Sequence, residues 1–434
     1  MALRFLRPRA AVVSVITALT LAACGDGGGA AEATPSNGDQ DTTHDPVTTL
    51  DGGAGSASLD GGTTVHPGDG TSPTKLDAAL PPKATSDASH GGGSASDAGR
   101  IGPTASDDAG DTAPPPPVGD GSCPSTLAGW ASVSGDGVTT TTGGGSAKAV
   151  RPTTAAELQK YATDPAPQVI ELTTNFEVPE LKIGSNKTLV GIGSNITISG
   201  GIAIKGDKSA AVSNVILRNI HLNGETASSN DAVTLQYAHH VWIDHCDFYD
   251  GPDGTLDMTH AVNWVTVSWT KIRYTSKYHN APGEDVAQHR FASLLGHSDN
   301  NASEDSNRIK VTFHHDWWAE GVIERMPRVR FGQVHVYNNY FSSTGNNYCV
   351  RAGASAAVLI ESNYFDGVAS PHQFNSADDE KTANITARDN VYDKTSGDQA
   401  TGGGGPAFTK APYSPVIESA DSVPAIVKQC AGPR

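Results

Sequence analysis

A seven-fold repeat in the second half of the chain constrains its fold more than any other feature. Each copy begins with an apolar residue and has two more apolar residues, two and seven places further on. Successive copies start 26, 24, 46, 23, 24 and 27 residues apart, and the long interval is one period plus an insertion around residues 274–307. A near-constant period of this length indicates structural units that stack on one another. The starting residues are Val215, Val241, Val265, Val311, Val334, Val358 and Ile385.

The apolar pair in each copy has the period of a β-strand, because residues two apart project from the same face. The copies are short and rich in β-branched and aromatic residues, which favours strands over a pair of helices. We therefore predict an all-β fold, a parallel β-helix in which each copy forms one turn. Side chains five places after the start of the last four copies predict a ladder of hydrogen bonds between turns. These are Asp316, Asn339, Asn363 and Asn390.

The first 122 residues differ in composition from the repeat region. Three arginines precede an apolar run at residues 10–19, and small residues stand directly before Cys24. This segment resembles a bacterial lipoprotein signal, so we expect residues 1–23 to be removed and Cys24 to be acylated. The alternative is an ordinary signal peptide. Residues 24–122 contain too few apolar residues to bury a core, and we interpret them as a disordered linker before a folded domain at 123–434.

The ends and the charge of the chain limit its partners. Gly25 after the cysteine resembles an outer-membrane sorting signal, which predicts a secreted domain at the surface of a Gram-negative bacterium, with membrane contact only through Cys24. A net charge of −17 argues against nucleic acid as a partner. We expect a monomer. Four further cysteines permit two disulfides in any of three connectivities, which stay open. They are Cys123, Cys246, Cys349 and Cys430.

Charged residues recur in the loops that enter successive turns. With neighbouring turns about 4.8 Å apart, three aspartates can converge, and two arginines follow about 10 to 15 Å along the axis. Converging carboxylates repel one another unless a cation lies between them, and Ca²⁺ accepts such irregular loop geometry. The alternative is that the aspartates only cap turns and the arginines only form surface ion pairs. The residues are Asp231, Asp253, Asp257, Arg325 and Arg330.

Five motifs in this region resemble, in order and spacing, the extracellular pectate lyases of polysaccharide lyase family 1. The resemblance extends from Leu127 to about Pro412 and implies a right-handed parallel β-helix. It also implies endo-type cleavage of α-1,4-polygalacturonate by β-elimination, which leaves a 4,5-unsaturated product. The motifs begin at His240 (HVWIDHC), Asp253 (DGTLD), Val265 (VTVSW), Val311 (VTFHH) and Arg325 (RMPRVRFG).

The resemblance also implies roles for individual residues. Asp231, Asp253 and Asp257 match the family's Ca²⁺ ligands, Arg325 its catalytic base and Arg330 a substrate-binding arginine. Because a guanidinium gives up its proton only at high pH, this base predicts activity that rises into the alkaline range. Two adjacent histidines of the fourth motif lie within a strand pattern, and we predict that they are structural. They are His314 and His315.

The chain departs from the family at one substrate-binding position. Where the family has a lysine, five residues before the glycine of a Leu-x-Gly segment, this chain has Phe291. We expect Arg290 or Lys277 to bind the sugar carboxylate instead. Three other functions stay open: a pectin lyase that needs no calcium, a glycoside hydrolase using Asp253 and Asp257 as paired carboxylates, and a polysaccharide-binding β-helix without catalysis.

Overall fold

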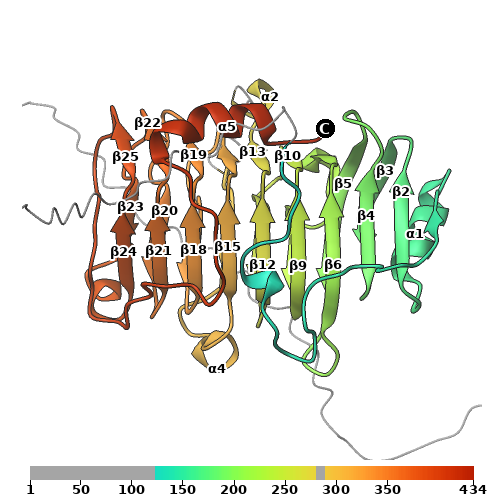
Figure 1. Ribbon diagram of the computed structural model, residues 1–434, viewed down its shortest axis with the longest axis horizontal. Coiled ribbons are helices and arrows are strands. Elements are labelled where there is room, and N and C mark those ends of the chain that lie inside the picture. The colour runs from blue at the N-terminus through green and yellow to red at the C-terminus, as the bar shows by residue number, and fades with distance from the viewer. Residues whose placement is uncertain (1–122, 280–288) are drawn as a thin grey trace, which may run out of the picture. The chain divides into compact units, whose positions relative to one another are not determined.

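Two parallel sheets form the walls of a coil. The structure is a computed structural model, and it describes residues 123–279 and 289–434. The first sheet has ten strands, all paired in parallel, and Figure 1 shows most of them side by side. In order along the coil they are β1 (Ala149–Val150), β2 (Gln168–Leu172), β4 (Lys187–Gly191), β6 (Val212–Arg218), β9 (Ala238–Asp244), β12 (Asn263–Ser268), β15 (Lys310–His314), β18 (Gln333–Tyr337), β21 (Ala357–Glu361) and β24 (Asn384–Arg388).

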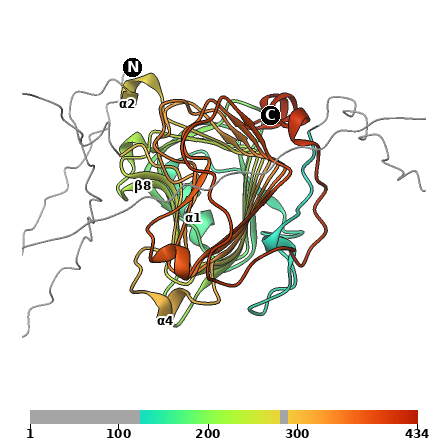
Figure 2. The ribbon, with the colours of Figure 1, turned by 90° about the vertical axis from the view of Figure 1, so that its left-hand side faces the viewer.

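The second sheet divides into two arms at its longest strand, β5 (Thr197–Lys205). The first half of β5 pairs with β7 and its second half with β8, so each turn has three sides, as the view along the coil shows (Figure 2). One arm contains β7 (His221–Asn223), β10 (Asp247–Tyr249), β13 (Lys271–Arg273), β16 (Trp317–Trp318), β19 (Tyr340–Phe341), β22 (Tyr364–Asp366) and β25 (Val391–Asp393). The other, called the β8 arm below, contains β8 (Asp231–Gln236), β11 (Gly254–Thr259), β14 (Leu294–Leu295), β17 (Arg328–Arg330), β20 (Val350–Gly353) and β23 (His372–Phe374), while β3 (Phe176–Lys182) pairs with β5.

The predicted parallel β-helix is confirmed, with its turns in the register that the repeat predicts. The seven starting residues from Val215 to Ile385 pair in an unbroken series across the first sheet. The apolar residues seven places on pair in the same way from Leu222 to Tyr392. Nearly all of these side chains are buried in one continuous core. Stacked turns thus supply each other with apolar contacts that no single turn could make.

The repeat does not include the first three strands of this sheet. Lys187 of β4 pairs with Val215 and occupies the starting position of its turn. Its side chain is buried, and its ammonium donates to the carbonyls of Ala166 and Ser185 at 3.0 and 2.7 Å. Two carbonyl acceptors thus compensate a buried ammonium where the template has valine. The coil is therefore longer than the repeat indicates.

The predicted ladder is also present. The backbone N–H of Thr270 donates to Asp316, and the N–H of Asp316 donates to Asn339, at 2.8 and 2.9 Å. The N–H groups of Asn339 and Asn363 continue the series by donating to Asn363 and Asn390. These bonds satisfy backbone N–H groups at a bend between strands, where no strand pairing is available.

Helices cover the first end and one edge of the coil (Figure 1). Helix α1 (Ala155–Thr163) begins at Thr154, whose side chain caps it, and buries Leu158 and Ala162 in the core. Helix α5 (Val423–Cys430) packs Val423 and Val427 against Tyr340 of β19. The remaining helical elements are short: α2 (Ser276–His279), α4 (Ala302–Asp305), and the 3-10 turns η1 (Trp130–Ser132), η2 (Gly224–Thr226), η3 (Asp379–Lys381) and η4 (Ala420–Ser422).

The N-terminal part of the chain lies outside the described residues. This applies to the predicted signal peptide (1–23), to Cys24 and to nearly all of the predicted linker (24–122). Within the described ranges, no helix combines the length and the apolar character that a membrane crossing requires.

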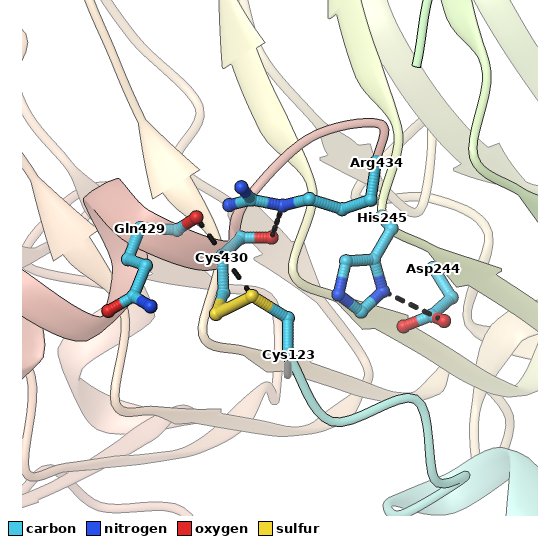
Figure 3. Close-up of a disulfide and its surroundings, with 6 residues drawn as sticks. All are labelled: Cys123, Asp244, His245, Gln429, Cys430 and Arg434. Carbon is cyan, nitrogen blue, oxygen red and sulfur yellow. Dashed lines mark hydrogen bonds and ion pairs between the residues drawn. A yellow bond between two sulfur atoms is a disulfide. The ribbon is translucent and has the colours of Figure 1, made fainter. Parts of the chain in front are cut away.

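One disulfide joins the two ends of the described chain. Cys123 is bonded to Cys430 of α5, and Arg434 Nε donates to the carbonyl of Cys430 at 3.3 Å (Figure 3). Cys246 and Cys349 are buried free thiols. Of the two disulfides that the cysteine count permits, the described residues therefore contain one. The free thiols belong to different turns, where Cys246 lies near the carbonyl of Leu217 and Cys349 near Asn346.

We expect Cys123→Ser to lower the free energy of unfolding by about 2 to 5 kcal/mol, because the disulfide closes a loop of almost the whole domain. Thermal unfolding of the oxidised variant and wild type measures the difference. Reducing agent should lower the Tm of wild type and leave the Tm of Cys123→Ser unchanged. An equal response of both proteins to reductant would contradict a stabilising role for this bond.

Candidate active site

The β8 arm brings the three predicted aspartates together on two successive turns. Asp231 begins β8 and pairs with Gly254, the first residue of β11. Asp257 lies three residues further along β11 and is 8% exposed, whereas the side chain of Asp253 is 44% exposed. Parallel pairing therefore places these side chains, which are up to 26 residues apart in sequence, on adjacent turns. The sequence predicts loops for all three, but Asp231 and Asp257 lie within strands, and only Asp253 lies in a loop.

Gly254 allows two of the carboxylates to approach each other. A Cβ atom at this position would lie 2.8 Å from Oδ1 of Asp231 and 3.1 Å from Oδ1 of Asp257. Both oxygens therefore line the space that a side chain would fill. Any larger residue would enter the space between the carboxylates, so glycine here keeps a small oxygen-lined pocket open.

Burial and mutual repulsion disfavour the charged forms of these carboxylates. Burial, and then the charge of Asp253, raise the pKa of Asp231 to about 6. Burial, and then the charge of Asp231, raise the pKa of Asp257 well above its usual value, although Leu294 N donates to this carboxylate at 3.0 Å. A bound cation would remove this repulsion, and oxygen ligands of this kind suit Ca²⁺. The donor set therefore fits the predicted metal.

The three carboxylates are not arranged tightly around one point. Within residues 123–279 and 289–434, the one group of three side chains whose ligand atoms all lie within 4.8 Å of one another is His260, His297 and Glu304. Asp231 and Asp257 thus form the inner part of the predicted site, and the exposed Asp253, 3.8 Å from His289, forms its outer part.

Arg325 lies near the carboxylates, three residues before the start of β17. Its guanidinium carbon is 3.9 Å from the centre of the Phe291 ring, and its charge lowers the pKa of both Asp231 and Asp257. Its Nε is buried and has no hydrogen-bond partner among the described residues. The backbone of Arg325 has φ of 62°, and its carbonyl accepts from Ser293 at 2.7 Å. A ring face and nearby charges thus support this guanidinium, and its Nε makes no hydrogen bond.

Phe291 therefore lies where the resemblance places a lysine, and its ring supports the candidate base. Tyr274 holds this segment in place, because its hydroxyl lies 3.0 Å from the carbonyl oxygen of Gly251 and 2.9 Å from that of Phe291 and can donate its one proton to either. Tyr274 is fully buried and belongs to the insertion, where the repeat gives no position for it. No sequence pattern predicts that Phe291 supports Arg325 or that Tyr274 holds the Phe291 segment in place.

Arg330, at the end of β17, is buried, at 6% exposure. Its Nε forms an ion pair with the exposed Asp299, and its Nη1 donates to the carbonyl of Gly296 at 2.9 Å. Burial, and then the charge of Arg328, lower the pKa of Arg330, while Asp299 raises it. The structure thus places the predicted substrate-binding arginine on the β8 arm with an acidic partner that the sequence does not predict.

The two cations proposed to replace the lysine both contact protein groups. Arg290 is partly buried, and its Nη1 donates to the carbonyl of Gly321 at 2.8 Å. Lys277 forms an ion pair with Glu225 of η2, and its side chain is 65% exposed. The exposed Lys277 has more freedom to reach a ligand. Neither contact brings these residues to the ring of Phe291.

The two adjacent histidines lie on the first sheet, away from this arm. His314 ends β15 and is 4% exposed, and burial lowers its pKa well below the usual value. His315 stacks on Trp269 and contacts Glu418 at 2.8 Å. Both are therefore packed against other protein groups, in agreement with their predicted structural role.

The group of His260, His297 and Glu304 is unsuited to a metal despite its short distances. Glu304 already contacts His260 and Asn301, each at 2.8 Å, and also Tyr237. The two imidazole rings stack with centroids 4.0 Å apart and an interplanar angle of 28°. Stacked rings hold their lone pairs in two separate, nearly parallel planes, which is a poor arrangement for binding one ion. We interpret this group as a hydrogen-bonded anchor.

Comparison with known proteins adds a family relationship. The family model described as pectate lyase matches residues 122–410. Pectate trisaccharide-lyase of Thermotoga maritima is 37% identical over 234 residues, which cover 50% of this chain and 58% of that protein. Pectate lyase A of Aspergillus niger is 35% identical over 233 residues, covering 49% and 65%. The chain thus spans about three fifths of the length of these two curated relatives.

Solved structures agree with the fold. A Bacillus pectate lyase in complex with trigalacturonate is 24% identical with a TM-score of 0.58, covering 71% of this chain and 99% of that one. A pectate lyase bound to a hexasaccharide is 21% identical with a TM-score of 0.54, covering 70% and 96%. At these identities the similarity shows a common β-helix.

Proposed function

Because the chain belongs to the pectate lyase family, we propose that it is a polysaccharide lyase that cleaves polygalacturonate by β-elimination. The observation that carries this proposal is the pairing of Asp231 and Asp257 across Gly254, with the guanidinium of Arg325 beside them. A cation site next to a candidate base is the combination that proton abstraction beside a carboxylate requires.

We assign the cation as Ca²⁺, held by Asp231, Asp257 and the outer Asp253. When bound, Ca²⁺ would withdraw charge from the uronate carboxylate and so acidify the proton on the neighbouring C5 atom. The protein side chains supply the rest of the chemistry. The two inner carboxylates would hold the metal, and the more exposed Asp253 would complete its ligands.

In the proposed reaction, Arg325 takes the proton from C5. The electrons of the C5–H bond form the C4–C5 double bond, the C4–O bond breaks, and the departing oxygen receives a proton from solvent. Phe291 holds the guanidinium from one side without using its hydrogen-bond donors. Arg330 of β17 lies two strands from Asp257 of β11 and three from Asp231 of β8, and it binds a carboxylate of the polymer, which lies across the strands of the β8 arm. Lys277 is the stronger of the two candidates for a further carboxylate contact, since Arg290 is partly buried.

An endo mode and a location outside the cytoplasm complete the proposal. The β8 arm continues past the site to β20 and β23, so a long polymer can extend across several turns. The Cys123–Cys430 disulfide requires an oxidising compartment, which supports secretion. Lipidation at Cys24 and a monomeric state stay predictions from the sequence.

The test is an assay of the full chain on polygalacturonate and on highly methyl-esterified pectin. We expect the ultraviolet absorbance of an unsaturated uronide on polygalacturonate, together with a rapid fall in viscosity that indicates endo cleavage. New reducing ends without this absorbance would indicate a hydrolase using Asp253 and Asp257. Absorbance only on esterified pectin would indicate a pectin lyase, and binding without products would indicate a non-catalytic module.

A further inference from the structure

The guanidinium of Arg330 is held by one short loop, residues 296–306, which we call the 296–306 loop. Asp299 pairs with Nε, and the carbonyl of Gly296 accepts from Nη1 at 2.9 Å. No hydrogen bond joins Nη2 to any of the described residues. Two nitrogens are therefore fixed by the loop, and the third remains available to a ligand.

Gly296 is the residue that lets the loop approach so closely. It has φ of +78°, and a Cβ atom there would lie 3.0 Å from Cβ of Arg330. A residue with a side chain would be strained in this conformation and would also contact Arg330 closely. The loop and the arginine are thus fitted to each other at the backbone as well as through charge.

The far end of the loop is anchored to the turn that follows β11. Glu304 contacts His260 and Tyr237, and it also forms an ion pair with Lys208 at 3.4 Å. The neighbouring Asp305 is fully buried and accepts from the backbone N–H of Ala261 at 2.7 Å. Two consecutive carboxylates of α4 therefore hold the loop to an adjacent turn of the coil.

The charges of this anchor are stable over a wide pH range. Hydrogen bonds from Tyr237 and His260 outweigh burial and lower the pKa of Glu304 to about 2. Burial, and then the contact with Glu304, raise the pKa of Tyr237 to about 12. Glu304 therefore stays charged and Tyr237 stays a donor from mildly acidic to strongly alkaline conditions, which include those proposed for the lyase reaction.

We propose that Asp299 is a positioning residue that orients Arg330 for substrate, and that the Glu304 anchor holds Asp299 in place. This inference rests on the proposed function. Asp299 lies on the solvent side of Arg330, with its side chain 54% exposed while that of Arg330 is 7% exposed. Without a fixed partner, the guanidinium of Arg330 could adopt several orientations. The anchored carboxylate of Asp299 fixes Nε and leaves Nη2 for a polymer carboxylate.

The anchored loop argues against a second interpretation, in which Asp299 occupies the place of the substrate carboxylate and is displaced by it. Displacement would require the loop to move, and the contacts of Glu304 and Asp305 would have to break. The two interpretations predict opposite changes in KM. A fixed orienting residue lowers KM, whereas a competing carboxylate raises it.

The experiment is a double-mutant cycle in the full chain, measured as kcat and KM on polygalacturonate. We expect Asp299→Ala to raise KM about tenfold with kcat changed less than about twofold, because an oriented substrate contact is lost without loss of the base. Asp299→Asn, which keeps an oxygen acceptor for Nε, should recover part of this loss. In an Arg330→Ala background, Asp299→Ala should cause no further change in KM, since its partner is absent.

Two further variants test the anchor and the specificity of the effect. Glu304→Gln should raise KM in the same direction as Asp299→Ala, and Asp378→Ala is the matched control, because it removes a fully exposed carboxylate at another turn. A lower KM in Asp299→Ala, or an equal effect with and without Arg330, would overturn the positioning role.

Failure of the proposed function has a different signature. A wild-type protein that forms no unsaturated product leaves the kinetic cycle without a signal. The NMR resonance of the Arg330 Nε–H group, identified by its absence from Arg330→Lys, then still reports the loop. We expect it to shift in Asp299→Ala and in Glu304→Gln, and an unchanged resonance in both would overturn the inference independently of activity.

Discussion

Arg325→Ala is expected to lower kcat on polygalacturonate by about a thousandfold, within the range of about 10²- to 10⁴-fold that a positioned base contributes. The fold should be retained, because Nε of Arg325 has no hydrogen-bond partner among the described residues. The two buried carboxylates lose a nearby positive charge that lowers their pKa. The stacking contact with Phe291 is lost, which is a small cost at a half-buried site. Initial rates of product absorbance, with circular dichroism of the same samples, measure both effects.

Arg325→Lys and a remote arginine complete this test. Lysine keeps a positive charge but not the planar shape that lies against Phe291, so we expect its rate to remain far below that of wild type. Arg151→Ala is the control, because Arg151 is exposed and its ion pair, among residues 123–279 and 289–434, is with Glu171 at another turn. The rate of wild type should rise into alkaline pH. An Arg325→Ala rate within tenfold of wild type would refute the assignment of this residue as the base.

The repeat predicts most of the coil because the interior of each turn must be apolar at the same places. Val241, Val265 and Val311 stack in register for this reason, and the strands that carry them follow. The turn that starts at Lys187 escapes the pattern, because backbone carbonyls compensate its buried ammonium. A repeat defined by apolar residues cannot detect a buried lysine whose ammonium is compensated by hydrogen bonds.

The candidate site is predictable only where it follows the period. The offsets of Asp231 and Asp257 from the next turn predict that they lie close together, and the structure brings them together across Gly254. Asp299 and Glu304 lie inside the insertion, where no offset relates a residue to its neighbours in space. Their contacts with Arg330 and His260 depend on how the loop folds back. Sequence periodicity therefore finds the carboxylates of the β8 arm and misses the loop that contacts Arg330.

Removal of calcium is expected to abolish activity and to destabilise the protein, because the buried carboxylates lose their counter-ion. At a free Ca²⁺ concentration of about 100 times Kd, binding should stabilise the folded state by about 2.7 kcal/mol. The Tm of wild type should thus rise with added Ca²⁺ and fall with chelator, and product formation should fall at least a hundredfold with chelator. Mg²⁺ at the same concentration should give a smaller shift, since it requires a more regular set of ligands.

Asp257→Asn distinguishes the loss of stability caused by the neighbouring carboxylates from their role in binding the metal. Asp257 is buried beside Asp231, and both burial and the neighbouring charge raise its pKa. Replacing the carboxylate with an amide removes that repulsion, so the calcium-free variant should have a higher Tm than calcium-free wild type. The same change removes a metal ligand, so the Tm should no longer respond to Ca²⁺ and activity should be lost. A residue that only caps a turn would show the reverse, with a lower Tm and normal activity. A more stable but inactive variant would therefore indicate that these carboxylates are kept together for catalysis at the expense of stability.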